Sequence, residues 1–154
     1  MPEAERTRWL DAEEQQVWRA YLEASQLLLH RLGRDLDESE HDLSLPEYEL
    51  LVRLSEAEGW SLRMSELAED LVHSRSRLTH ATARLEQRGL VERRACPGDR
   101  RGVLAVMTEE GHRALVRAAP LHVSGVREHL FDQLGPQDVR ALGRIATKIA
   151  EHLR

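Results

Sequence analysis

Residues 73–102 read HSRSRLTHATARLEQRGLVERRACPGDRRG and hold eight arginines against three acids, a local charge of +5. The whole chain has a net charge of −5, so this stretch is a basic island in an acidic protein. Solubility requires only a net charge of either sign. A concentrated positive charge is better explained as a surface shaped for a polyanion.

The hydrophobic period changes within this stretch. Residues 74–88 carry apolar side chains at helical spacing, and Gly89 is placed to end that helix. Residues 90–94 resemble a strand, residues 96–99 have the composition of a turn, and residues 103–107 form a second, apolar strand. The sequence therefore predicts a helix followed directly by a β-hairpin, the wing, whose loop is rich in arginine.

The residues before this stretch predict two further helices. Residues 65–72 (SELAEDLV) have one apolar face, and the tight turn that follows gives the spacing of a helix-turn-helix. Ser44 and Glu47 form the sequence of a capping box, Pro46 lies in the first turn, and Gly59 is the expected stop. Residues 60–64 are a short link between these two helices.

Both ends of the chain predict long, apolar-striped helices. One runs from about Trp9 to Asp37, and a polar connection (residues 38–43) follows it. Thr108 caps another helix, which Pro120 should kink or break, and Pro136 starts the last one. We expect a mainly α fold with a small β-hairpin wing. A winged helix-turn-helix at residues 43–107 would be flanked by dimerisation helices at residues 1–42 and 108–154.

Length and composition limit the class of protein. A chain of 154 residues suits one domain, or one domain with appended helices. No apolar run approaches a membrane span, and the N-terminus lacks a signal-peptide core, so a cytoplasmic protein is expected. The one cysteine, Cys96, excludes an internal disulfide and a multi-cysteine zinc site. No phosphate-binding glycine loop or nucleophile motif is present, so neither an enzyme nor a cofactor is expected.

The basic helix predicts one buried and one polar face. Leu78, Ala81 and Leu85 cluster on one side of a helical wheel, as a core face does. The opposite side carries Ser76, His80, Ala83 and Gln87, flanked by Arg77, Thr79 and Arg84. Such side chains suit base edges in a DNA major groove, and Ser74 and Arg75 at the helix start suit a phosphate. The alternative is an ordinary solvated, arginine-rich helix face.

The wing offers a second set of basic side chains. Asp99, Arg100 and Arg101 are expected at the hairpin tip, where a protruding arginine suits the negative potential of a narrow minor groove. Asp99 cannot bind phosphate, so we expect it to pair with a neighbouring arginine and fix the loop. The alternative is an ordinary charged turn.

Residues 45–111 resemble the MarR family of bacterial winged-helix regulators. The matching segments are SELAEDL, the helix from Ser74 to Leu85, RLEQRGLVERR, the wing DRR, and VMTEEG at the start of the next helix. The family pattern is Asp-x-Arg followed by Leu-Thr-x-x-Gly. Here Asp99-Arg100-Arg101 is followed by Met107-Thr108-Glu109-Glu110-Gly111, with methionine in place of the usual leucine.

The resemblance implies a homodimer that binds a pseudo-palindromic double-stranded DNA operator, usually as a repressor. Residues 74–84 would lie in the major groove, and Arg101, with Arg100, would enter the minor groove. The expected DNA-contacting residues are Ser74, Arg75, Ser76, Arg77, Thr79, His80, Arg84, Asp99, Arg100 and Arg101. A winged helix used only for protein contact remains the competing class, although it would not need arginines on both the helix and the wing.

The resemblance also implies a switch. Many members release DNA when a small phenolic or aromatic anion binds between the dimer helices and the winged helix. The candidate lining residues here are Trp18, Tyr21, His30, Tyr48 and His112, and core packing is the alternative reading of each. Some relatives sense oxidants through a cysteine near the first helix, a position that Cys96 does not match. His122 and His129, about 10.5 Å apart along one helix, are too distant to share a metal ion, and no metal is expected. Regulation without a ligand, or by oxidation, stays open.

Overall fold

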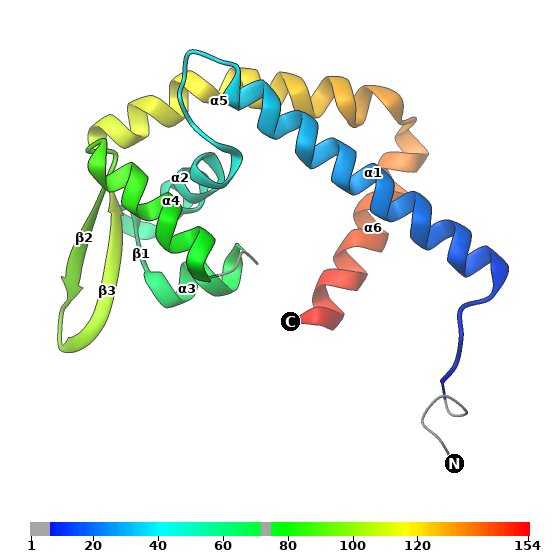
Figure 1. Ribbon diagram of the computed structural model, residues 1–154, viewed down its shortest axis with the longest axis horizontal. Helices are drawn as coiled ribbons and strands as arrows, with labels where there is room; N and C mark the ends of the chain where they lie inside the picture. Colours follow the sequence, from blue (N-terminus) through cyan, green and yellow to red (C-terminus); the bar gives the residue numbers. More distant parts are fainter. Residues whose placement is uncertain (1–6, 72–74) are drawn as a thin grey trace. The chain divides into compact units, whose positions relative to one another are not determined.

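The computed structural model describes residues 7–71 and 75–154, and the fold is mainly helical with a three-stranded antiparallel sheet (Figure 1). The expected fold class is therefore confirmed. The chain divides into two compact units, with the boundary after Arg31. No helix in the described ranges is both long enough and apolar enough to span a membrane.

The helices keep the expected order, but α2 and α5 differ from the expectation. They are α1 (Ala12–Asp37), α2 (Leu45–Glu56), α3 (Met64–Asp70), α4 (Arg75–Gln87), α5 (Glu109–His129) and α6 (Pro136–Leu153). Helix α2 ends at Glu56 rather than at Gly59, which lies with φ +62° in a short 3-10 turn, Glu58–Trp60. Helix α5 continues unbroken through Pro120, so the expected break is wrong. Pro120 is exposed, so water can reach the carbonyl group that loses its helical hydrogen bond.

The start of α2 is fixed by the expected capping box. The Ser44 N–H donates to Glu47 Oε2 at 3.0 Å, and the Glu47 N–H donates to Ser44 Oγ at 3.4 Å. Leu43 and Tyr48, on either side of this cap, are both buried, as a hydrophobic staple requires. The cap therefore fixes where the chain enters α2.

The end of α4 is a Schellman motif, which explains the abrupt change of period at Gly89. The Gly89 N–H donates to Glu86 O, and the Leu90 N–H donates to Leu85 O. Gly89 has φ +71°, a left-handed conformation that glycine adopts without a steric penalty. Leu85 and Leu90 are both buried, so the motif turns the chain directly from α4 into the sheet.

The sheet has the strand order β1–β3–β2. Strands β2 (Val91–Cys96) and β3 (Asp99–Met107) form the wing, joined by a turn of Pro97 and Gly98. Strand β1 (Ser61–Arg63) pairs with β3, with Ser61 opposite Val106, and was expected only as a link. Strand β3 begins four residues earlier than expected, so Arg100 and Arg101 lie in the strand beside the turn and not in a loop. Cys96, the last residue of β2, lies opposite Asp99 beside this turn.

The core lies around α2. Leu50, Leu51 and Leu54 are fully buried there and belong to one cluster with side chains of α3, α4, β2, β3 and α5. Helix α2 contacts both α4 and α5. The buried face of α4 therefore rests on α2, and its other face is left at the surface.

Candidate nucleic-acid interface

Helix α4 divides into the two predicted faces. Leu78, Ala81 and Leu85 are buried, with exposed fractions of 4%, 5% and 0%. Exposed side chains on the remaining faces are Ser76, Arg77, Thr79, His80, Arg84, Glu86 and Gln87, while Ala83 is half-buried. Ser74 and the side chain of Arg75, which were expected to hold a phosphate, lie outside the described residues.

One polar side chain of α4 is fully buried. Thr82 has no exposed surface, and its Oγ1 donates to Leu78 O at 2.7 Å. The sequence did not predict this burial, because threonine is more often exposed than buried. The hydrogen bond to the carbonyl one turn earlier satisfies the hydroxyl and allows its burial.

A groove runs beside the exposed face of α4. Its volume is about 540 Å³, and it is lined by Ser44, Pro46, Glu47, Ser76, Arg77, His80, Ala81 and Arg84. Four of the predicted contact residues of α4 therefore share one hollow with the start of α2. No local pattern in the sequence predicted that the α2 cap would form the other wall of this groove.

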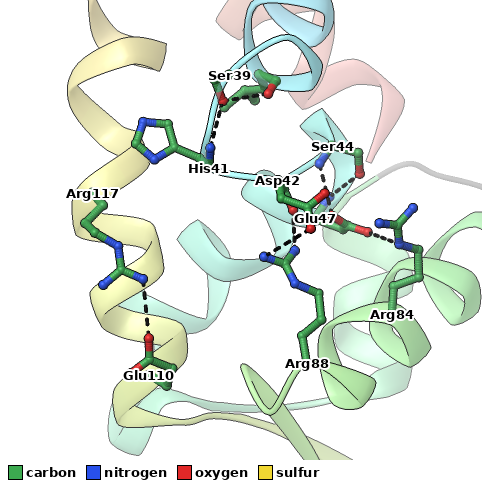
Figure 2. A network of polar contacts seen from close by, with 10 residues as sticks. Ser39, His41, Asp42, Ser44, Glu47, Arg84, Arg88, Glu110 and Arg117 are labelled. Atoms are coloured by element: carbon green, nitrogen blue, oxygen red, sulfur yellow. Dashed lines mark hydrogen bonds and ion pairs between the residues drawn. The ribbon is translucent and has the colours of Figure 1, made fainter.

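Glu47 closes this groove and holds one of its arginines. Its carboxylate is almost fully buried, and Oε1 lies 3.0 Å from Arg84 Nε (Figure 2). One helical turn further, Arg88 donates through Nη1 to the Asp42 carbonyl, and its Nη2 lies 3.8 Å from Asp42 Oδ2. Arg84 of α4 thus binds the first turn of α2, and Arg88, one residue past the end of α4, binds the segment that leads into α2.

The wing presents its arginines beside a fixed turn. Arg100 and Arg101 are exposed, and the Arg101 N–H donates to Asp99 Oδ1 at 3.0 Å. Asp99 Oδ2 accepts from Arg63 Nη1 at 3.2 Å. Asp99 therefore pairs with an arginine as expected, but that arginine comes from β1. The backbone N–H of Arg101, helped by the N–H of Gly102 and by Arg63, lowers the pKa of Asp99, so the carboxylate stays ionised.

Two further arginines of the basic stretch, both on β2, are paired with local acids. Arg93 donates through Nε to Glu86, and Arg94 lies 2.7 Å from Glu92. Both pairs are at least 40% exposed, so they are weak and leave the side chains accessible. The two pairs lower the local positive charge along β2. Arg100 and Arg101, beside the turn, belong to neither pair.

The candidate effector residues are split between the two units. Trp18, Tyr21 and His30 are exposed on α1, in the unit that ends at Arg31, and the rings of Trp18 and Tyr21 stack 6.2 Å apart. In the other unit, Tyr48 is buried against His122, with ring centres 4.4 Å apart, and His112 stacks on Trp60 at 4.5 Å. Burial raises the pKa of Tyr48. Tyr48 and His112 thus make the packing contacts that were the alternative reading, and the effector site stays a prediction.

The described residues contain no group of three or more His, Cys, Asp or Glu side chains that could hold a metal ion. Cys96 is buried. The exposed predicted contact residues lie on α4 and on the wing.

Comparisons with known proteins agree on one family. The MarR family model matches residues 43–103. The crystal structure of Sco3205, a MarR family transcriptional regulator from Streptomyces coelicolor in complex with DNA, is 47% identical with a TM-score of 0.89, covering 97% of this chain and 92% of that chain. AbsC, a MarR family transcriptional regulator from the same organism, is 47% identical with a TM-score of 0.86, covering 96% of this chain and 99% of the AbsC chain. The HTH-type transcriptional regulator PecS of Dickeya dadantii is 32% identical over 120 residues, 74% of this chain and 72% of PecS.

Proposed function

The chain belongs to the MarR family of transcriptional regulators, and from that premise we propose that it binds double-stranded DNA in a sequence-specific manner. It acts as a homodimer on a pseudo-palindromic operator and represses transcription from it. The observation that carries this proposal is the pairing of an exposed polar face on α4 with exposed arginines on the wing, within one compact unit. The similar protein Sco3205 was crystallised with DNA.

Helix α4 is the recognition helix in this proposal. Its small and hydrogen-bonding side chains enter the major groove, where Arg77 or Arg84 can bind guanine O6 and N7, and Ser76 and Thr79 can bind bases or phosphates. His80 lines the same groove as Ser76, Arg77 and Arg84. Because Leu78, Ala81 and Leu85 fix the opposite face in the core, the helix presents these groups on a rigid element.

The wing supplies the minor-groove contact. The backbone N–H of Arg101 donates to Asp99, and Asp99 also accepts from Arg63. These bonds fix the backbone from which the Arg101 side chain extends. A narrow A·T-rich minor groove attracts such a side chain through its negative potential. The wing therefore reads shape, whereas α4 reads base edges.

Two exposed apolar surfaces support the dimer. On α6, Leu142, Ile145, Ile149 and Leu153 are between 38% and 75% exposed at helical spacing. On α1, Val17, Trp18 and Tyr21 are more than half exposed. A soluble chain rarely leaves two apolar stripes uncovered, and a second copy of the chain would cover both. Two-fold symmetry then requires half-sites about one helical turn apart.

Release of DNA by a small aromatic anion belongs to the same proposal, with Trp18, Tyr21, His30, Tyr48 and His112 as the residues to test. Regulation without a ligand, or through oxidation of Cys96, is the alternative. Isothermal titration with salicylate as the probe distinguishes the two: heat of binding together with loss of DNA affinity supports an anion effector.

Salt dependence tests DNA binding itself. A surface that neutralises six or more phosphates gives a slope of about −5 or steeper in a plot of log affinity against log salt. Fluorescence anisotropy with a labelled 30-base-pair duplex measures this slope. An affinity that stays flat between low and moderate salt would contradict DNA binding and favour a winged helix that contacts protein.

A further inference from the structure

Glu47 combines two properties that the capping box alone does not explain. It is 1% exposed, and both of its carboxylate oxygens are used: Oε2 accepts from the Ser44 N–H, and Oε1 lies 3.0 Å from Arg84 Nε. A capping-box glutamate needs only the first of these contacts, and most such residues lie at the surface. The second contact joins the cap of α2 to α4.

The arginine in this pair is anchored at one end and accessible at the other. Its Nε side turns toward Glu47 (Figure 2), while the side chain as a whole keeps 47% of its surface exposed. It faces the same groove as Arg77 and His80. Arg84 is thus a partly exposed guanidinium whose position is set by a buried acid.

The charges indicate what such an arginine can contribute. A carboxylate 3.0 Å away cancels most of its field at a distance, so Arg84 adds little to the non-specific attraction for phosphates. The buried acid in the groove would also repel a phosphate that entered it. What remains is the geometry of the Nη groups, which is the property that bidentate recognition of a base requires.

We propose that Glu47 is a positioning residue that holds Arg84 for reading a base pair and keeps it from serving as a phosphate contact. This rests on the proposed DNA-binding function and names one specificity determinant within it. The competing explanation is structural: Arg84 only neutralises a carboxylate buried by the helix cap. The two explanations differ in what Glu47→Gln does to base preference.

The test is a comparison of variants on a pool of random 30-base-pair duplexes, with bound and unbound fractions sequenced. Glu47→Gln keeps an oxygen for the Ser44 N–H but loses the charge that fixes Arg84. We expect discrimination at one base pair of each half-site to fall from about tenfold or more to less than threefold. Arg84→Gln should lose preference at the same base pair, while preference elsewhere stays.

Salt dependence gives a second readout, which reports whether Arg84 has been released from its pair with Glu47. In Glu47→Gln the released arginine becomes a free cation, so the slope on a fixed random-sequence duplex should steepen by about 0.9 per protomer. Glu47→Asp keeps the charge but is too short to reach both partners, so it should lose the base preference with the slope unchanged. Glu47→Asp also tests the base preference if Glu47→Gln does not fold.

Ser44→Ala is the matched control, because it weakens the same cap without touching the pair with Arg84. It should lower the melting temperature and leave the base preferences as in the wild type. The inference would be overturned if both Glu47 variants kept the wild-type preference at the base pair that depends on Arg84. It would also be overturned if Arg84→Gln altered no base pair. In either case the proposed DNA-binding function would still stand. A wild-type protein that selects no sequence would overturn the proposed function with it.

Discussion

Gly111→Ala should strongly destabilise the fold at the junction between the wing and α5. A Cβ built at Gly111 would lie 2.1 Å from the Leu90 carbonyl oxygen and 2.9 Å from Met107 Cγ. The Leu90 oxygen also accepts from the Thr108 N–H at 3.0 Å, so it cannot retreat without breaking that bond. The backbone at Leu90 and helix α5 must therefore separate by about 1 Å, since a carbon–oxygen contact needs roughly 3.3 Å.

The magnitude follows from these contacts. Overpacking costs about 1–3 kcal/mol, and the lost hydrogen bond costs about 1 kcal/mol more. The better helix propensity of alanine offsets up to about 1 kcal/mol of this. We expect a net loss of about 2–3 kcal/mol in the free energy of unfolding, a large part of the stability of an ordinary domain.

Urea unfolding followed by circular dichroism at 222 nm measures this loss, at one fixed protein concentration because association adds to stability. Gly143→Ala in α6 is the matched control, since nothing lies within 4 Å of its added Cβ. It should be neutral or stabilising by up to about 1 kcal/mol. A Gly111→Ala protein as stable as the wild type would refute the close approach of α5 to Leu90.

The wing, the apolar stripe of α6 and the half-buried His122 each allow a further test. Arg101→Ala should weaken DNA binding, measured by fluorescence anisotropy, most at duplexes with a narrow A·T minor groove. Arg94 pairs with Glu92, so the control Arg94→Ala should lower the affinity less and by the same factor for all duplexes. If Arg101→Ala lowered the affinity for all duplexes equally, the wing assignment would be refuted. Leu142→Glu with Ile145→Glu should give a folded monomer in light scattering, because two charges on the exposed α6 stripe cannot be buried in a dimer; an intact dimer would place the interface elsewhere. Burial lowers the pKa of His122, so the neutral imidazole is favoured in the folded chain. The stability that the neutral imidazole contributes is therefore complete above the unfolded pKa of about 6.5, and it is lost as the pH falls through the lower folded pKa. His122→Phe should therefore show a smaller fall in unfolding free energy between pH 7.5 and 5.5, and an unchanged fall would contradict the shift.

Local sequence signals predicted the elements that local chemistry determines. The Ser44 and Glu47 pair marked the start of α2, and Gly89 marked the end of α4, because caps involve residues only a few positions apart. The wheel of α4 separated Leu78 from His80, since burial follows helical period. Fold class could therefore be predicted from the sequence.

The contacts that define the site join residues distant in the chain and were not predictable. Arg63 reaches Asp99 only because a three-residue strand, β1, pairs with the wing, and such a strand is too short to show a period. Likewise Glu47 and Arg84 meet because α2 packs on α4. The early start of β3 follows from the tight Pro97–Gly98 turn, which places Asp99 opposite Cys96 and draws Arg100 and Arg101 into the strand.

Sequence-specific binding of an operator can be measured by selecting bound duplexes from a random pool. We expect enrichment of an inverted repeat, with half-site centres about 10–10.5 base pairs apart and an A·T-rich flank where the wing lies. Base preferences should be strongest where α4 meets the major groove. Recovery of unenriched sequence, with the folded protein binding every duplex equally, would contradict a sequence-specific regulator.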